Sequence, residues 1–178
     1  MKKSGYSKMW LPIMIVLSLF IGIPLNTSAQ LLKGQKSIEF SFGQSDLGYI
    51  LHAGYTGYLS DRFSVLGFGF FETANPYQLN YKNFGLAVLG RYRILSLNDI
   101  LLITPYGGLE GNVDQITPVG KAYNYAVNYG FQLGLEAEVS LNTRFSFYGN
   151  FNQLLLAKSL IGSKRYDYNL GVRLYLNN

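Results

Sequence analysis

The sequence predicts an all-β protein, an eight-stranded antiparallel up-and-down transmembrane β-barrel that follows an N-terminal signal peptide. Three observations lead to this prediction. Apolar residues alternate with small or polar ones along most of the chain, the alternating segments number eight, and many contain ten residues or more. A tilted strand of about that length crosses a bilayer. Strands of soluble proteins average roughly five or six residues, so segment length favours a membrane barrel.

The clearest alternation covers residues 127–139, where every odd position is apolar and every even position is Gly, Asn, Gln or Glu. Residues 84–94 and 167–176 show the same period of two. Successive side chains of a strand point to opposite faces, so each segment has one apolar face and one small or polar face. We predict the eight strands at 36–43, 49–59, 63–73, 82–94, 100–113, 125–139, 145–155 and 166–176.

Two of these strands carry irregular features. Residues 63–73 have apolar residues or glycine on both faces, so the pattern does not decide which face points inward. Pro105 falls inside the fifth strand, and proline lacks the N–H that a strand ladder uses, so this position is typical of a bulge.

The connections between the predicted strands alternate in length. Residues 60–62, 95–99 and 141–144 form short linkers rich in Asn, Asp and Ser, which are typical of tight turns. The other linkers mostly run longer, at 74–81, 114–124 and 156–165, and only 44–48 is short. Outer-membrane barrels place short turns in the periplasm and longer loops outside. With eight strands, both chain ends then lie on the periplasmic side.

Residues 1–29 have the organisation of a secretory signal peptide. Three lysines within the first eight residues precede an apolar run of 17 residues, and small residues end the segment. We predict cleavage between Ala29 and Gln30, which leaves a barrel domain of residues 30–178. The alternative is a single membrane-spanning helix, but the run is at the short limit for a span and has prolines near both ends.

The composition excludes several other classes of protein. The 178 residues include 20 Gly, 15 Tyr and 12 Phe, and only 14% are charged, unlike a disordered chain. The chain has no Cys, which excludes a disulfide scaffold, a thiolate zinc site and a thiol nucleophile. Removal of the first 29 residues takes three lysines and lowers the formal charge from +5 to +2. Basicity therefore identifies no direct nucleic-acid site.

The apolar faces are expected to contact outer-membrane lipid. Within a bilayer the backbone N–H and C=O groups need partners in the protein, and strands supply these only by closing into a barrel. An eight-stranded barrel has an interior just wide enough for side chains to fill. The predicted interior is made of Gly, Ala, Ser, Asn, Tyr and a few charged residues, which disfavours an open diffusion pore.

Six charged side chains are predicted to meet at one level of the barrel interior, near the periplasmic end. If the first strand runs outward, three acidic and three basic inward-facing residues share this level. They are Glu39, Arg91, Arg93, Glu136, Glu138 and Arg173. We interpret them as a structural ion network that offsets the cost of burying each charge. An acid–base site is the alternative, but guanidinium groups stay protonated and shuttle protons poorly.

The sequence predicts no catalytic, cofactor-binding or metal-binding residues. The only histidine, His52, is predicted to face inward near the outer end of the second strand, and one histidine cannot make a multi-histidine metal site. A Ser–His pair stays formally possible, as in barrels that modify lipids, but no spacing selects its serine. Glycine-rich stretches at 67–69 and 107–108 lie within strands and open no helix, so they indicate room for large neighbours rather than phosphate loops.

Several segments resemble the TraO family of transfer proteins from Bacteroides-type conjugative transposons. The resemblance covers nearly all of the chain after the signal peptide. The matching segments are Ala29-Gln30-Leu31-Leu32-Lys33-Gly34-Gln35-Lys36-Ser37-Ile38-Glu39, Asn75-Pro76-Tyr77, Gly90-Arg91-Tyr92, Asn128-Tyr129-Gly130, Leu135-Glu136-Ala137-Glu138, Asn142-Thr143-Arg144-Phe145 and Tyr168-Asn169-Leu170-Gly171-Val172-Arg173-Leu174.

This resemblance implies an outer-membrane structural or interaction component of a conjugative DNA-transfer apparatus related to type IV secretion machinery, with other conjugative transfer proteins as partners. It carries over no catalytic residues. The alternatives are a general small outer-membrane barrel for envelope integrity or adhesion and, third, a lipid-modifying enzyme that uses His52.

Overall fold

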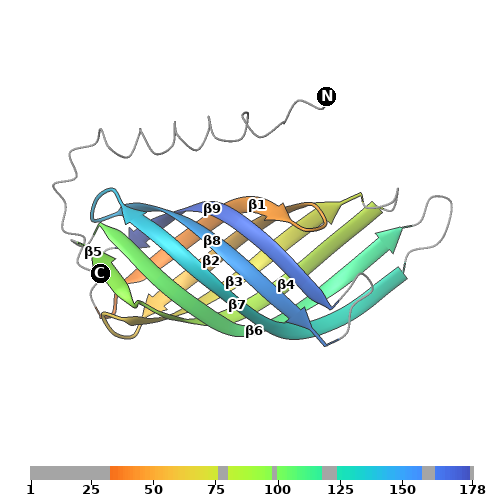
Figure 1. The fold of residues 1–178 in the computed structure, drawn as a ribbon, viewed down its shortest axis with the longest axis horizontal. Coiled ribbons are helices and arrows are strands. Elements are labelled where there is room, and N and C mark those ends of the chain that lie inside the picture. The colour runs from red at the N-terminus through yellow and green to blue at the C-terminus, as the bar shows by residue number, and fades with distance from the viewer. Residues whose placement is uncertain (1–32, 76–79, 98–99, 118–123, 158–162, 177–178) are drawn as a thin grey trace, which may run out of the picture.

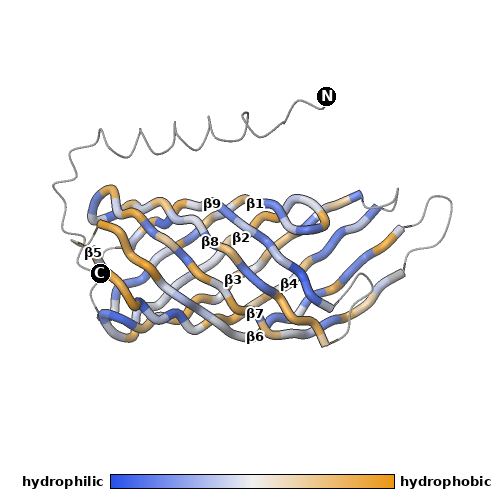
Figure 2. Tube along the Cα trace, viewed as in Figure 1, coloured by the Kyte–Doolittle hydropathy of each residue, from blue (hydrophilic) through white to orange (hydrophobic). Residues whose placement is uncertain are grey.

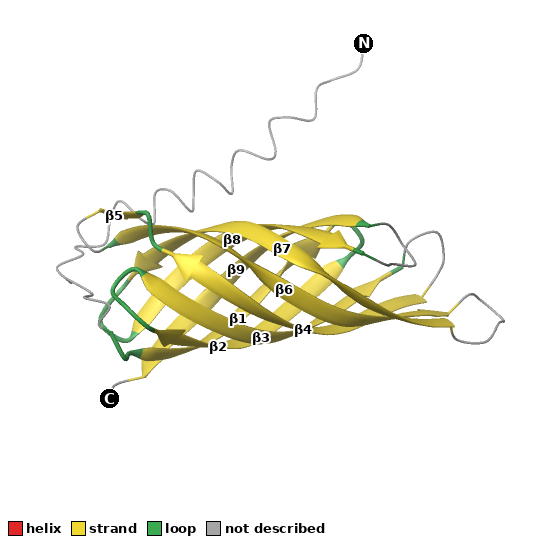
Figure 3. Cartoon of the chain, turned by 90° about the horizontal axis from the view of Figure 1, so that it is seen from below, coloured by secondary structure: helices red, strands yellow, loops and turns green. Residues whose placement is uncertain are grey.

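The computed structural model describes residues 33–75, 80–97, 100–117, 124–157 and 163–176, and in these ranges the regular structure is entirely strand (Figures 1 and 3). No helix in this part of the chain has the length and apolarity needed to span a membrane. The predicted signal peptide, with its cleavage between Ala29 and Gln30, lies outside the described residues. The strands are β1 (Lys36–Ser45), β2 (Tyr49–Tyr58), β3 (Phe63–Ala74), β4 (Asn80–Tyr92), β5 (Leu95–Leu97), β6 (Leu101–Thr117), β7 (Asn124–Ser140), β8 (Phe145–Leu156) and β9 (Lys164–Leu176).

Eight of the strands close into an antiparallel barrel, which confirms the predicted fold. The order around the sheet is β4-β3-β2-β1-β9-β8-β7-β6, and pairing of β4 with β6 completes the ring. Each sequential neighbour pairs antiparallel, as in an up-and-down barrel. The predicted strands agree with the observed ones to within a few residues, because only a period of two keeps one face apolar along a whole strand.

The strands are staggered by ten residues around the ring. If paired residues are followed from strand to strand around the barrel, starting at Ser45 on β1, the path reaches Tyr58 on β2. The N–H of Tyr58 donates to Gln35 O at 3.0 Å, so the path returns to the first strand ten residues before Ser45. The intermediate residues are Asp167, Asn152, Gly134, Tyr106, Arg91 and Ser64. Eight strands with this stagger close only when tilted by about 35–45°. Figure 1 shows the strands running obliquely to the long axis.

The two ends of the barrel differ in their connections. We call the end where β1 begins and β9 finishes the turn end, and the opposite end the loop end. The links 59–62 and 141–144 close the turn end, and the links after β1, β3, β6 and β8 are at the loop end. The prediction of a simple turn at 95–99 is wrong, because residues 95–97 form β5 and pair with residues 101–103 of β6.

A local irregularity ends β4 opposite Pro105. The proline does not interrupt β6, where it pairs with Leu135 of β7. On the other edge of β6, Arg91 pairs with Tyr106 and Leu95 pairs with Ile103. The three residues 92–94 between these pairs therefore lie opposite only two residues of β6, 104 and 105. The extra residue therefore lies on the strand beside Pro105, where the missing N–H leaves the ladder incomplete.

The two faces of the sheet differ as the alternation predicts. Outward-facing Leu86, Val127 and Leu170 are 72%, 71% and 76% exposed, whereas inward-facing Asn128 and Glu136 are each 1% exposed. Figure 2 shows hydrophobic and hydrophilic residues alternating along the strands. On β3, the inward residues are Ser64, Leu66, Phe68, Phe70 and Glu72, which resolves the orientation that the sequence leaves open.

Candidate functional site

The inner network is a cluster of five buried charges near the turn end: Glu39, Arg91, Glu136, Glu138 and Arg173. Arg173 on β9 is its centre. The guanidinium group contacts Glu39 at 3.1 Å and Glu136 at 2.8 Å, and it also pairs with Glu138. Each of these four side chains is no more than 2% exposed. One guanidinium thus neutralises carboxylates from β1 and β7 across the barrel interior.

Arg91 on β4 joins the same cluster from the opposite wall. Its guanidinium nitrogens lie 2.6 Å from Glu39 Oε1 and 3.1 Å from Glu136 Oε2. The hydroxyl groups of Thr56 and Tyr175 donate hydrogen bonds to Glu39 and Glu138. Each charge therefore has an opposite charge beside it, and Glu39 and Glu138 also accept a hydrogen bond from a neutral hydroxyl group. Buried ion pairs are tolerated under these conditions.

Arg93 departs from the predicted cluster. It is half-buried, and within the described residues it makes no ion pair, although it lines the small cavity beside Glu136 and Glu138 at the turn end. Its backbone N–H donates to Arg62 O at 2.8 Å. Arg93 lies one residue beyond the end of β4, at the irregularity opposite Pro105, where it reaches the cavity but forms no ion pair with its carboxylates.

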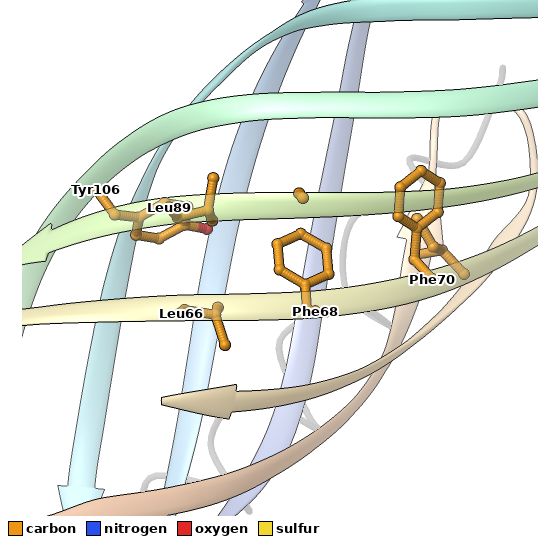
Figure 4. Close-up of a cluster of buried hydrophobic side chains, with 7 residues drawn as sticks. Leu66, Phe68, Phe70, Leu89 and Tyr106 are labelled. Carbon is orange, nitrogen blue, oxygen red and sulfur yellow. The ribbon is translucent and has the colours of Figure 1, made fainter. Parts of the chain in front are cut away.

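The luminal plug is an apolar cluster in the middle of the barrel interior. Figure 4 shows Leu66, Phe68 and Phe70 on β3 near Leu89 on β4 and Tyr106 on β6. Ile50 and Ala87 complete the cluster, and all seven residues are buried. A small cavity of about 20 Å³ lies on each side of the plug. The interior is therefore packed, as expected for eight strands.

Inward-facing Gly85 makes room for the plug, whereas the sequence predicts this role for the stretches at 67–69 and 107–108, and for Gly67 that prediction is wrong. Gly85 pairs with Phe70, and a Cβ at Gly85 would lie 2.3 Å from the Phe70 ring. By contrast, Gly67 faces outward on β3, and a Cβ there would have no atom within 4 Å. Position 85 therefore requires glycine for packing, while position 67 does not.

This difference gives a matched pair of substitutions. We expect Gly85→Ala to lower the free energy of unfolding by about 1–3 kcal/mol, because the added methyl overpacks the plug. We expect Gly67→Ala to be neutral or slightly stabilising, because alanine loses less backbone entropy in a strand than glycine does. Urea unfolding of both variants in detergent checks the prediction. Equal effects at the two positions would contradict it.

An outer network of buried polar residues lies between the plug and the loop end, and sequence reasoning missed it. Arg165 on β9 lies 3.1 Å from Asp114 on β6 and 3.6 Å from Glu72 on β3. The Tyr81 hydroxyl donates to Asp114 at 2.6 Å, and the Arg165 guanidinium donates to the same hydroxyl oxygen at 2.5 Å. Four strands are thus tied together where they approach the loop end.

Amide side chains extend this outer network. Asn128 donates to Asn112 at 2.8 Å and to Asp114 at 2.7 Å, and Asn83 donates to Glu72 at 3.2 Å. Asp167 accepts hydrogen bonds from the amides of Asn152 and Asn169. Asp114 and Arg165 fall in predicted loops, because the predicted strands end at 113 and begin at 166. Extending the alternation of β6 and β9 by one or two residues would have found them.

His52 lies in the interior between the two networks. Its Nδ1 is 3.2 Å from Ser41 Oγ, and its ring meets the Phe68 and Phe70 rings edge-on at centroid distances of 5.1 and 5.9 Å. The structure therefore brings a Ser–His pair together, with Ser41 as the partner that the sequence does not select. Ser41 is buried and His52 is half-buried on the inward face of the sheet, and both residues also line the large hollow described next.

No trio of His, Asp or Glu among the described residues is spaced to hold a metal ion. A hollow of about 1250 Å³ is lined mainly by outward-facing apolar residues such as Phe40, Leu51 and Leu86. Inward-facing Ser41, His52, Asn112 and Asn128 also reach this hollow, but apolar residues dominate its lining, which therefore offers mainly contacts to hydrocarbon.

Comparison with known proteins shows the fold. No protein-family model and no curated protein matches the chain. Among solved structures, the N-terminal β-barrel domain of Pseudomonas aeruginosa OprF matches with a TM-score of 0.60 and 12% identity, over 81% of this chain and 98% of that one. A major outer membrane protein from Thermus thermophilus matches with a TM-score of 0.64 and 13% identity, over 80% and 98%. Ail, the attachment invasion locus protein of Yersinia pestis, gives 0.51 and 11%, over 80% and 97%. This chain therefore has the barrel fold that small outer-membrane proteins share.

Proposed function

We propose that this protein is a plugged outer-membrane β-barrel that serves envelope integrity or attachment through its surface and its two ends, rather than as a channel or an enzyme. The observation that carries this proposal is an apolar exterior around an interior filled by two polar networks and the luminal plug. A filled interior leaves only the exterior and the ends available to other molecules.

The distribution of outward-facing side chains supports insertion into a bilayer. Phe63, Tyr92 and Phe145 lie on the strands at the turn end, and Tyr49 and Tyr166 lie near the loop end. Exposed aliphatic residues, including Leu86, Val88, Leu109, Leu133 and Leu170, occupy positions between them. Two aromatic girdles that flank an aliphatic band are typical of outer-membrane barrels.

A second candidate function is a structural component of a conjugative DNA-transfer apparatus, held in the outer membrane and bound to other transfer proteins. The observation that favours it is the resemblance to the TraO family, which runs through most of the barrel sequence. Four of the matching segments together contain all five inner-network residues. Glu39 ends the first segment, Arg91 is in 90–92, Glu136 and Glu138 are in 135–138, and Arg173 is in the last segment.

One deletion strain tests both candidates. We expect the protein to fractionate with outer membranes, and we expect its deletion to increase sensitivity to detergents or to reduce surface attachment while conjugation frequency stays normal. Complementation with the intact gene should restore the wild-type phenotype. Loss of conjugative transfer in a strain with a normal envelope would overturn the first candidate and support the second. Recovery of the protein in the soluble fraction would overturn both.

A further inference from the structure

A small cavity lies inside the outer network, on the loop side of the luminal plug. It has a volume of about 20 Å³, and its polar lining includes Glu72, Glu110, Asp167, Asn83 and Gln132, with Arg165 on one side. A volume of this size holds one water-sized particle. Most of the polar side chains that reach the cavity present acceptor oxygens.

The outer network contains more carboxylates than cations. Four acidic side chains are buried there, Glu72, Glu110, Asp114 and Asp167, and Arg165 is the only buried cation among the described residues of this network. Arg165 pairs with Asp114 and, at 3.6 Å, with Glu72. Glu110 and Asp167 form no ion pair within the described part of the chain. Burying such charges without a partner is costly.

Two amide oxygens add to the surplus of acceptors. Asn83 Oδ1 and Gln132 Oε1 are buried and have no hydrogen-bond donor in the structure, and their residues are 1% and 2% exposed. The Asn83 amide orientation is fixed because its Nδ2 already donates to Glu72. The unsatisfied group beside the cavity is therefore the oxygen, which attracts a positive charge or a donor.

We propose that this cavity binds one small monovalent cation, such as K⁺, Na⁺ or NH₄⁺. The carboxylates of Glu110 and Asp167 supply the negative charge, and the oxygens of Asn83 and Gln132 complete the surroundings. A divalent ion is disfavoured, because no trio of carboxylates in the described residues is close enough to coordinate a metal directly. The proposal does not depend on whether the barrel serves the envelope or a transfer apparatus.

Thermal unfolding of the intact protein, extracted from outer membranes in a nonionic detergent, tests this proposal. Melting temperatures are compared in KCl, NaCl, NH₄Cl and tetramethylammonium chloride at one pH and one ionic strength. We expect at least one small cation to raise Tm by about 2–4 °C in a saturable manner. Tetramethylammonium is too large for the cavity and serves as the reference salt. Equal Tm values in all four salts would overturn the proposal.

Two variants locate the effect. Glu110→Gln and Asp167→Asn each remove one uncompensated carboxylate, so we expect the cation-dependent rise in Tm to disappear. Asp61→Asn, at an exposed position in the turn between β2 and β3, is the matched control and should keep the full response. Persistence of the response in both Glu110→Gln and Asp167→Asn would refute the assignment to this cavity. Binding of Tl⁺ to the wild-type protein, followed by ²⁰⁵Tl NMR, gives a readout that does not depend on variant stability, and absence of a bound signal would count against the site.

Discussion

Replacing Arg173 by methionine is expected to lower the free energy of unfolding by about 3–5 kcal/mol, because it leaves buried carboxylates without their cation. Arg173 contacts all three acids of the inner network, and Glu138 has no other ion-pair partner within the described residues. Glu39 and Glu136 keep Arg91. Chemical unfolding of the detergent-solubilised protein measures the loss.

A second substitution separates charge burial from the loss of side-chain volume. Adding Glu138→Gln to Arg173→Met removes the acid that the first change leaves unpaired, so the double variant should regain much of the lost stability. Arg144→Met, at an exposed position in the turn between β7 and β8, is the control and should change stability little. If Arg173→Met is as stable as the control, the inner network does not stabilise the barrel.

The fold and most of the inner network could be predicted because both follow from a period of two. Glu136 and Glu138 stand at alternate positions of a strand whose other face is apolar, so their inward direction follows from β7 alone. The inward direction of Arg173 follows in the same way from the alternation of β9. Arg91 and Arg93 show the same alternation in the sequence. The irregularity opposite Pro105, however, depends on how β4 pairs with β6, and the pattern of a single strand gives no information about that pairing.

The luminal plug and the outer network could not be predicted because they depend on neighbouring strands. β3 is apolar or glycine on both faces, and its large residues turn inward where glycine on an adjacent strand leaves room, as Gly85 does for Phe70. Glu72 faces inward because it is on the same face of β3 as Phe70. The outer network also needs the ring of eight strands closed with its stagger, which brings Arg165 of β9 to Glu72 of β3.

Replacing Phe68 by alanine is expected to destabilise the barrel by about 3–5 kcal/mol, the usual cost of removing a large side chain from a packed interior. Phe68 is 9% exposed, packs beside Phe70 at a centroid distance of 6.2 Å, and meets the His52 ring edge-on. Phe147→Ala on β8 removes the same side chain from the outer face, where Phe147 is 47% exposed. The control should lose much less stability in a denaturant titration, and equal losses would show that the plug is not a packed core.

The same variant tests whether the barrel is closed at more than one level. On the turn side of the plug lie the inner network and a further buried layer of Tyr58, Leu102 and Tyr175. A hydrated ion that passes the space left by Phe68 still meets these two layers, and an apolar constriction excludes water. We therefore expect both the wild-type protein and Phe68→Ala to show no steady conductance in planar lipid bilayers. Steady currents through the wild-type protein would contradict a plugged interior, and currents through Phe68→Ala alone would make the luminal plug the sole barrier.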